Sequence, residues 1–205
     1  MDIKTVTSIA TFITSLVSLG TLWNVTKQRL TSNRPDIYVK DKPFKMSLAQ
    51  PENITLPIYN IGLGSAKNIK ITWKLDDEFV IKVKELDINN DNLIEYESKS
   101  NVYVGKHNKL IYLIHDLNEK IDFLLPYKSD SSTTDTILMP HSLTVLYSIY
   151  IELSVKHNIY KQEELFIFEI NYQDVNNKRY TKQFNVKFVL HTVDKNEVTG
   201  LIEIN

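Results

Sequence analysis

The most distinct polarity pattern of the chain lies near its N-terminus, where residues 5–25 contain no charged side chain. Hydroxyl-bearing residues recur there in steps of four and three, the spacing of one side of an α-helix. These residues are Thr7, Thr11, Thr14, Ser18 and Thr21. Twenty-one residues of helix cover the ~30 Å hydrocarbon core of a bilayer, and Trp23 lies where an interfacial aromatic belongs. The pattern predicts a single N-terminal transmembrane helix.

Three alternatives to a lone span stay open at this point. Nine of the 21 residues are Thr, Ser or Asn, so the stretch is only moderately apolar. Its hydroxyl face could pack against another membrane helix, because small residues allow close approach of two backbones. A signal peptide fits less well, since residues 18–20 are a poor cleavage site. An interfacial helix would carry Lys or Arg on its polar face, and this stretch has none.

The charges that flank this stretch predict its orientation. Lys27, Arg29 and Arg34 follow it, and the positive-inside bias then favours a C-terminal domain in the cytoplasm. Arg34 precedes a proline, which disfavours further helix. We therefore expect residues 1–34 to form the anchor with its basic juxtamembrane segment and residues 35–205 to form one domain at the cell membrane.

Strict alternation of apolar and polar residues begins beyond the anchor. Ile69, Ile71, Trp73 and Leu75 alternate with polar residues, so residues 68–75 are expected to form a strand with one buried face. Residues 79–83 repeat this pattern. Residues 43–51 contain two prolines and are expected to be irregular. Further short strands are expected at residues 36–39, 55–61, 93–96, 102–104, 110–114 and 121–125, with a loop at residues 128–136.

The C-terminal part reads as a β-hairpin. Residues 166–173 and 180–188 alternate in polarity, and residues 174–178 between them tolerate the left-handed conformation that tight turns need. Residues 141–155 are ambiguous, because the same apolar residues satisfy both a period of two and one helical face. The β-branched content favours a strand there, and a helix crossing between two sheets stays open.

Strands separated by frequent turn signals make the fold class mainly β, an antiparallel β-sandwich.

Composition narrows the possible classes of function. The net charge is −1 with both signs interspersed, which argues against nucleic acid as a partner. The chain has no cysteine, so a disulfide framework, a thiolate metal site and a cysteine nucleophile are excluded.

Two segments resemble a known family. Residues 57–69 contain Asn60, Gly62, Gly64, Ala66 and Asn68 at the spacing N-x-G-x-G-x-A-x-N. Residues 172–180 resemble a late Y-x-D-x-x-G-x-x-Y hairpin, with Asn177 in place of the usual glycine. Together they are similar to uncharacterised bacterial proteins with one N-terminal transmembrane helix and an immunoglobulin-like β-sandwich. The resemblance implies a fold and no active site.

Candidate chemistry is sparse along the chain. Asp87, Asn89 and Asp91 open like a calcium loop, but Asn92 stands where glycine is required and Ser98 where the bidentate glutamate belongs. The five histidines lack ligand spacing, and they are His107, His115, His141, His157 and His191. No phosphate loop or nucleophile elbow is present in the sequence. The sequence predicts no catalytic, cofactor or metal residue.

The leading hypothesis is a membrane-tethered protein-interaction module without catalytic activity, which contacts a protein partner through the hydroxyl face of its anchor or through loops and edge strands. Two alternatives stay open. One is an enzyme or carbohydrate-binding domain with a site built from loops. The other is an accessory subunit of a larger membrane complex.

Overall fold

The computed structural model describes residues 3–49, 51–89, 92–98, 101–105, 112–113, 118–127, 135–159, 164–194 and 197–205. Three helices are present in this part of the chain: α1 (Ile3–Ser32), α2 (Asp77–Leu86) and α3 (His141–Lys156). The strands are β1 (Ile37–Val39), β2 (Lys42–Ser47), β3 (Thr55–Asn60), β4 (Ala66–Leu75), β5 (Leu93–Ser98), β6 (Asn101–Gly105), β7 (Tyr112–Leu113), β8 (Asn118–Leu124), β9 (Asp135–Leu138), β10 (Glu164–Gln173), β11 (Arg179–Val193) and β12 (Glu197–Ile204).

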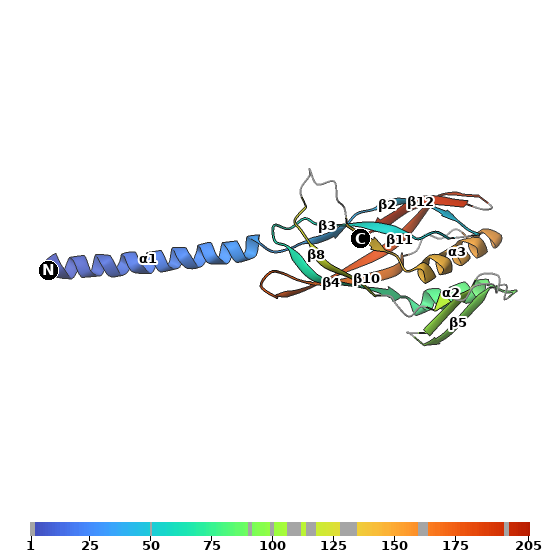
Figure 1. Ribbon diagram of the computed structural model, residues 1–205, viewed down its shortest axis with the longest axis horizontal. Helices are drawn as coiled ribbons and strands as arrows, with labels where there is room; N and C mark the ends of the chain where they lie inside the picture. The colour runs from blue at the N-terminus through green and yellow to red at the C-terminus, as the bar shows by residue number, and fades with distance from the viewer. Residues whose placement is uncertain are drawn as a thin grey trace.

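The strands form antiparallel sheets, so the chain is mainly β with a sandwich-like fold. The largest sheet has six strands in the order β2-β12-β11-β10-β4-β8. Two smaller sheets of three strands have the orders β1-β3-β9 and β5-β6-β7. Figure 1 shows α2, α3 and β5 at one end of this domain, while α1 projects alone from the other end along the long axis.

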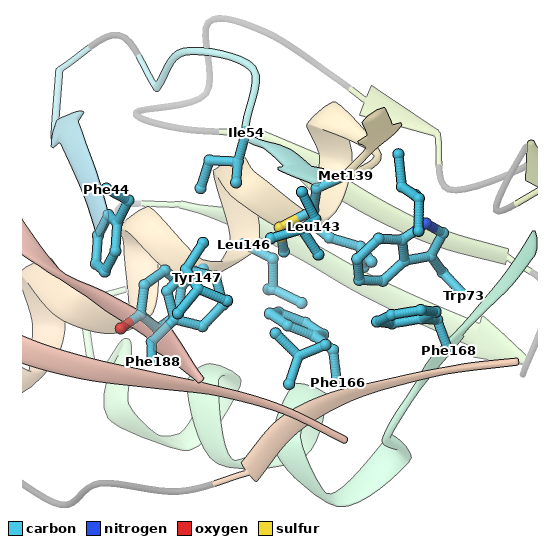
Figure 2. Close-up of a cluster of buried hydrophobic side chains, with 14 of the residues drawn as sticks. Phe44, Ile54, Trp73, Met139, Leu143, Leu146, Tyr147, Phe166, Phe168 and Phe188 are labelled. Carbon is cyan, nitrogen blue, oxygen red and sulfur yellow. The ribbon is translucent and has the colours of Figure 1, made fainter. Parts of the chain in front are cut away.

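An aromatic cluster within the core of the domain packs against α3. Figure 2 shows Leu143, Leu146 and Tyr147 of α3 facing side chains of β10 and β11. The ring centroids of Tyr147 and Phe188 lie 3.9 Å apart, and those of Trp73 and Phe168 on neighbouring strands lie 4.8 Å apart. Phe44 of β2 meets Phe188 edge to face at 5.2 Å. Offset and edge-on ring pairs of this kind add to the free energy of area burial.

The predicted strand over residues 141–155 is wrong, because these residues form helix α3. Twelve of the sixteen residues of α3 are buried, so the helix is covered on nearly all sides. A helix buried all round carries no polar face, and its sequence then loses the 3.6-residue signature that would separate it from a strand. Its length was the better indicator, since buried strands usually run four to eight residues.

The predicted strand over residues 79–83 is also wrong, because this segment lies within helix α2. Asp76 is the N-cap, and its Oδ1 accepts a hydrogen bond of 3.1 Å from the backbone N–H of Glu78. Asp77 and Glu78 place two acids in the first turn, where the helix dipole favours negative charge. The helix-capping residues therefore decide the structure of this segment, and the alternation of apolar and polar residues does not. Ile81, which the strand prediction placed on the buried face, is exposed on the helix surface.

The clearest strand predictions are confirmed. Residues 68–75 lie in β4, and β10 and β11 form the predicted hairpin, in which Tyr172 pairs with Tyr180. Three strands were missed: β2, which contains Pro43, and β9 and β12. In β12 the inward position Gly200 conceals the pattern, since a Cβ there would lie 2.2 Å from the carbonyl oxygen of Val189. Only glycine allows that approach.

The predicted transmembrane anchor is wrong. Helix α1 covers the expected residues 5–25 and extends beyond them to Ile3 and Ser32, but no helix in the described part of the chain is apolar enough over a sufficient length to cross a membrane. The hydroxyl and amide side chains counted above are the physical reason, because they lower the hydropathy of the stretch. The division of the chain after residue 34 stays a prediction.

We predict that Trp73→Ala lowers the free energy of unfolding by roughly 3–5 kcal/mol, measured by chemical denaturation. Trp73 is only 1% exposed and packs on Phe168, so truncation leaves a cavity in the core. Lys70→Ala on the exposed face of β4 is the matched control and should change stability by less than ~0.5 kcal/mol. A Trp73→Ala loss below about 1 kcal/mol would contradict this packing.

Candidate functional site

The junction between α1 and the β domain is held by a cluster of side-chain hydrogen bonds among the described residues. We define the junction as residues 33–36, 60–64, 124–127 and 174–180. Its centre is Asn60, a polar residue that is only 1% exposed. Its Oδ1 accepts from the backbone N–H groups of Asp36 at 3.0 Å and Gly62 at 3.2 Å. Its Nδ2 donates to the carbonyls of Gly64 at 2.7 Å and Leu124 at 3.2 Å.

Two of these bonds, to Asp36 and Leu124, join segments that are far apart in the sequence, and the other two hold the local turn. The backbone of Asn60 adds a fifth link, because its carbonyl accepts from the N–H of Tyr127 at 2.7 Å. The N–H of Ile61 donates to the carbonyl of Asp36 at 2.8 Å. A buried amide with all its groups paired is stabilising, whereas loss of such a side chain leaves several buried groups unpaired. Asn60 therefore fixes the chain leaving α1 against β3 and the end of β8.

Gly62 and Gly64 are required by space and not by backbone conformation. No described glycine has a positive φ. A Cβ at Gly62 would lie 2.3 Å from the carbonyl oxygen of Arg34, and one at Gly64 would lie 1.6 Å from that of Asn33. The turn after β3 thus packs directly on the backbone that leaves α1.

The turn between β10 and β11 forms the other wall of the junction. Asp174 is buried, and its Oδ1 accepts from the N–H groups of Asn176 at 2.8 Å and Lys178 at 2.9 Å. Its Oδ2 accepts from the hydroxyl of Tyr180 at 3.1 Å. Asn177 has a φ of 66°, so it occupies the left-handed position where the resembling hairpins carry glycine. Asparagine tolerates this conformation better than most residues.

Cations connect this turn to the chain leaving α1. The guanidinium of Arg34 lies 4.7 Å from the ring centroid of Tyr180, within the range of a cation–π contact. Lys182 pairs with the carboxylate of Asp36 and donates to the carbonyl of Ile37 at 2.8 Å. Desolvation raises the pKa of Tyr180, its bond to Asp174 raises it further, and Arg34 partly offsets both effects. The phenol of Tyr180 therefore stays protonated at neutral pH and acts as a donor.

Exposed apolar side chains surround this hydrogen-bonded centre. We call them the apolar rim, and they are Ile61, Leu63, Leu125, Tyr127 and Val175. Figure 1 places the β3–β4 turn and the β10–β11 turn at the end of the domain from which α1 projects. The amine of Lys67 links the two turns by donating to the carbonyl of Val175 at 3.3 Å. Grouped apolar residues on a surface mark an interaction site more often than scattered ones.

The hydroxyl face predicted for α1 is exposed over Thr11, Thr14, Ser18 and Thr21, and the side chain of Thr7 lies outside the described residues. The hydroxyl of Ser18 donates to the carbonyl of Thr14 at 2.8 Å, and that of Thr21 donates to Val17 at 2.9 Å. Hydroxyls bonded in this way satisfy themselves within the helix. Whether this face contacts a partner stays a prediction.

Asp87, the first residue of the segment that resembles a calcium loop, has a structural role. Asp87 is buried, and its Oδ2 accepts from the N–H of Asn92 at 2.8 Å, while Asp91 lies outside the described residues. His157 closes α3 with Nε2 3.0 Å from the carbonyl oxygen of Leu86. In the described ranges, no three His, Asp or Glu side chains could together hold a metal ion.

A shallow hollow lies between β4 and β8, over residues 68–70 and 120–122. Its lining brings Lys70 and Lys120 beside Asp122. Each of these charged side chains is solvent-exposed, which is usual for a polar sheet edge. The hollow supplies no arrangement of nucleophile and base among the described residues that line it.

The junction was not predicted as a site, although both of its motifs were recognised. Asn60, Gly62 and Gly64 belong to the first motif, and Asp174 and Tyr180 to the second. The sequence showed two turn patterns more than a hundred residues apart, and only the fold shows that both contact the chain leaving α1. The exposed apolar residues within the turns, Ile61 and Leu63 in the first and Val175 in the second, were the available signal, because turns are usually polar.

Comparison with known families identifies a relationship over most of the chain. The family model described as Domain of unknown function (DUF8453) matches residues 3–191. The chain belongs to this family. No curated protein and no solved structure matches it. The match begins at the first residue of α1 and ends within β11, so the helix and the junction are both part of the family domain. The resemblance to membrane-anchored immunoglobulin-like proteins is corrected accordingly, since the expected span is not found.

We predict that Gly64→Ala lowers the free energy of unfolding by about 1–3 kcal/mol and removes hydrogen-exchange protection from the amides of Asp36 and Ile61. The new Cβ would collide with the carbonyl of Asn33, which separates the turn from the end of α1. Gly20→Ala is the matched control, because its Cβ meets nothing within 4 Å. Equal protection of both amides in the two variants would contradict the proposed role of Gly64.

Proposed function

We propose that the protein is a non-catalytic protein-interaction module whose β domain holds α1 and the apolar rim in position for a protein partner. The observation that carries this proposal is the exposure of α1. All of its described side chains, residues 11–28, are exposed. They include Phe12 at 65% and Trp23 at 73% exposure. Large aromatic side chains anchor many protein interfaces, so their presentation on a projecting helix supports a binding role.

The helix needs a partner for its own stability. Most of the helical stability in proteins comes from packing of an apolar face, because isolated helices are marginal in water. The sequence of α1 is rich in Thr, Ser, Val and Ile, which are weaker helix formers than Ala or Leu. A partner that covers Phe12, Leu16, Leu19 and Trp23 would supply the missing packing.

The junction gives a second reason for the same proposal. Binding costs less free energy when the contact elements are already held in their bound geometry. Asn60, Gly64 and the contact of Arg34 with Tyr180 restrain the chain that leaves α1. The helix and the rim then meet a partner as one surface.

The other functional predictions made from the sequence stay predictions. No observation on the described residues favours the alternative of an enzyme or a carbohydrate-binding domain, or that of an accessory subunit of a membrane complex. A location at the cell membrane with the β domain on the cytoplasmic side stays a prediction. The narrower assignment to an immunoglobulin-like sandwich also stays a prediction.

Photo-crosslinking in living cells tests the proposal. A benzophenone amino acid replaces Trp23 on α1 or Leu63 in the rim, and adducts are identified by mass spectrometry. We expect both positions to give defined protein adducts, because both side chains face the proposed partner. Ile88 is the matched control, since it is equally apolar, 73% exposed and follows α2 at the opposite end of the domain. Protein adducts at Ile88 alone, or at none of the three positions, would contradict the proposed function.

A further inference from the structure

Helix α1 presents two stripes that repeat every seven residues. The large exposed residues Phe12, Leu16, Leu19 and Trp23 follow steps of four, three and four. The hydroxyl residues of the predicted face recur with the same period. Leu16 and Thr14 are two positions apart, about 200° around the helix, so the two stripes lie on opposite sides. An apolar repeat of 3.5 residues is the signature of a left-handed coiled coil.

We propose that α1 pairs with α1 of a second copy of this chain along the seam formed by Phe12, Leu16, Leu19 and Trp23. This inference rests on the proposed function and names the partner that α1 binds. In the sequence, Ile9 precedes Phe12 by three residues and Leu30 follows Trp23 by seven, with Thr26 at the position of the repeat between them. The seam would then extend over three heptads, the minimum length at which such a repeat is informative.

Self-association fits the surface better than contact with a lipid bilayer. A helix that lies on a membrane carries Lys or Arg along its polar side, whereas residues 5–25 contain no charge. The hydroxyls on that side bond to their own helix, as in the bond of 2.8 Å from Ser18 to the carbonyl of Thr14. The hydroxyl stripe therefore needs no partner, whereas the seam has to be covered. Ile13, Val17, Leu22 and Val25 are also exposed and apolar but lie off the seam.

The size of the seam matches a stable interface. At about 150 Å² for an aromatic side chain and roughly 100 Å² for an aliphatic one, full burial of the two aromatic and four aliphatic seam residues covers on the order of 700 Å² per copy. Specific protein interfaces bury about this area on each partner. A two-fold axis along the seam presents the same residues from both chains, so one surface complements itself.

Sedimentation equilibrium of the full-length chain in buffer without detergent tests this inference. We expect a species of twice the 23.8 kDa chain mass at micromolar concentration. Leu16→Lys and Leu19→Lys should each raise the dimer dissociation constant by roughly 30-fold or more, because a charge enters the seam. Thr14→Lys and Thr21→Lys are matched controls that place the same charge on the opposite side, and they should leave the dissociation constant unchanged.

Three results would overturn the inference. They are a monomer at all concentrations, equal effects of the seam and control variants, and a monomer that sediments with phosphatidylcholine or phosphatidylglycerol vesicles, which would indicate a lipid surface instead. The crosslinking at Trp23 separates this failure from failure of the proposed function. An adduct with a different protein would reject self-association and keep the interaction module, whereas the absence of any protein adduct would reject both.

Discussion

The hydrogen bonds of one buried amide organise the surface on which the proposed activity depends. Asn60 links the chain leaving α1, the turn after β3 and the end of β8, and all of its side-chain polar atoms are paired. Gly62 and Gly64 can approach the end of α1 only because they lack a Cβ. A polar group is costly to bury without partners and stabilising when every partner is present, so the junction has one well-defined arrangement.

Elements with one solvent-exposed face and one buried face could be predicted from the sequence, whereas elements buried on all sides could not. Strand β4 and the hairpin of β10 and β11 each have one solvent-exposed face and one buried face. The alternation of apolar and polar residues therefore predicted both correctly. Helix α3 has almost no wet face, so its residues satisfied a strand pattern as well as a helical one. In β12, Gly200 interrupts the apolar face where Val189 approaches, which hid the strand. The junction needs contacts across more than a hundred residues, and no local pattern carries that information.

Helix α1 shows how one pattern supports different interpretations. Its uncharged length suggested a membrane span, but its hydroxyls keep it below the apolarity that crossing requires. The same hydroxyls sit opposite Leu16 and Leu19 and repeat with them every seven residues. This arrangement is better explained by a helix whose apolar seam packs against a protein partner. On this account the β domain determines where α1 points, and α1 determines what the protein binds.

The distance between α1 and the β domain tests this account most directly. The chain has no cysteine, so Thr14→Cys and Asp122→Cys introduce two specific spin labels on exposed positions of α1 and β8. Double electron–electron resonance would then be recorded with the labelled chain diluted in unlabelled protein. The account predicts one narrow distance distribution, which broadens when Asn60→Ala removes the centre of the junction. A broad distribution in the chain with Asn60 intact would contradict it.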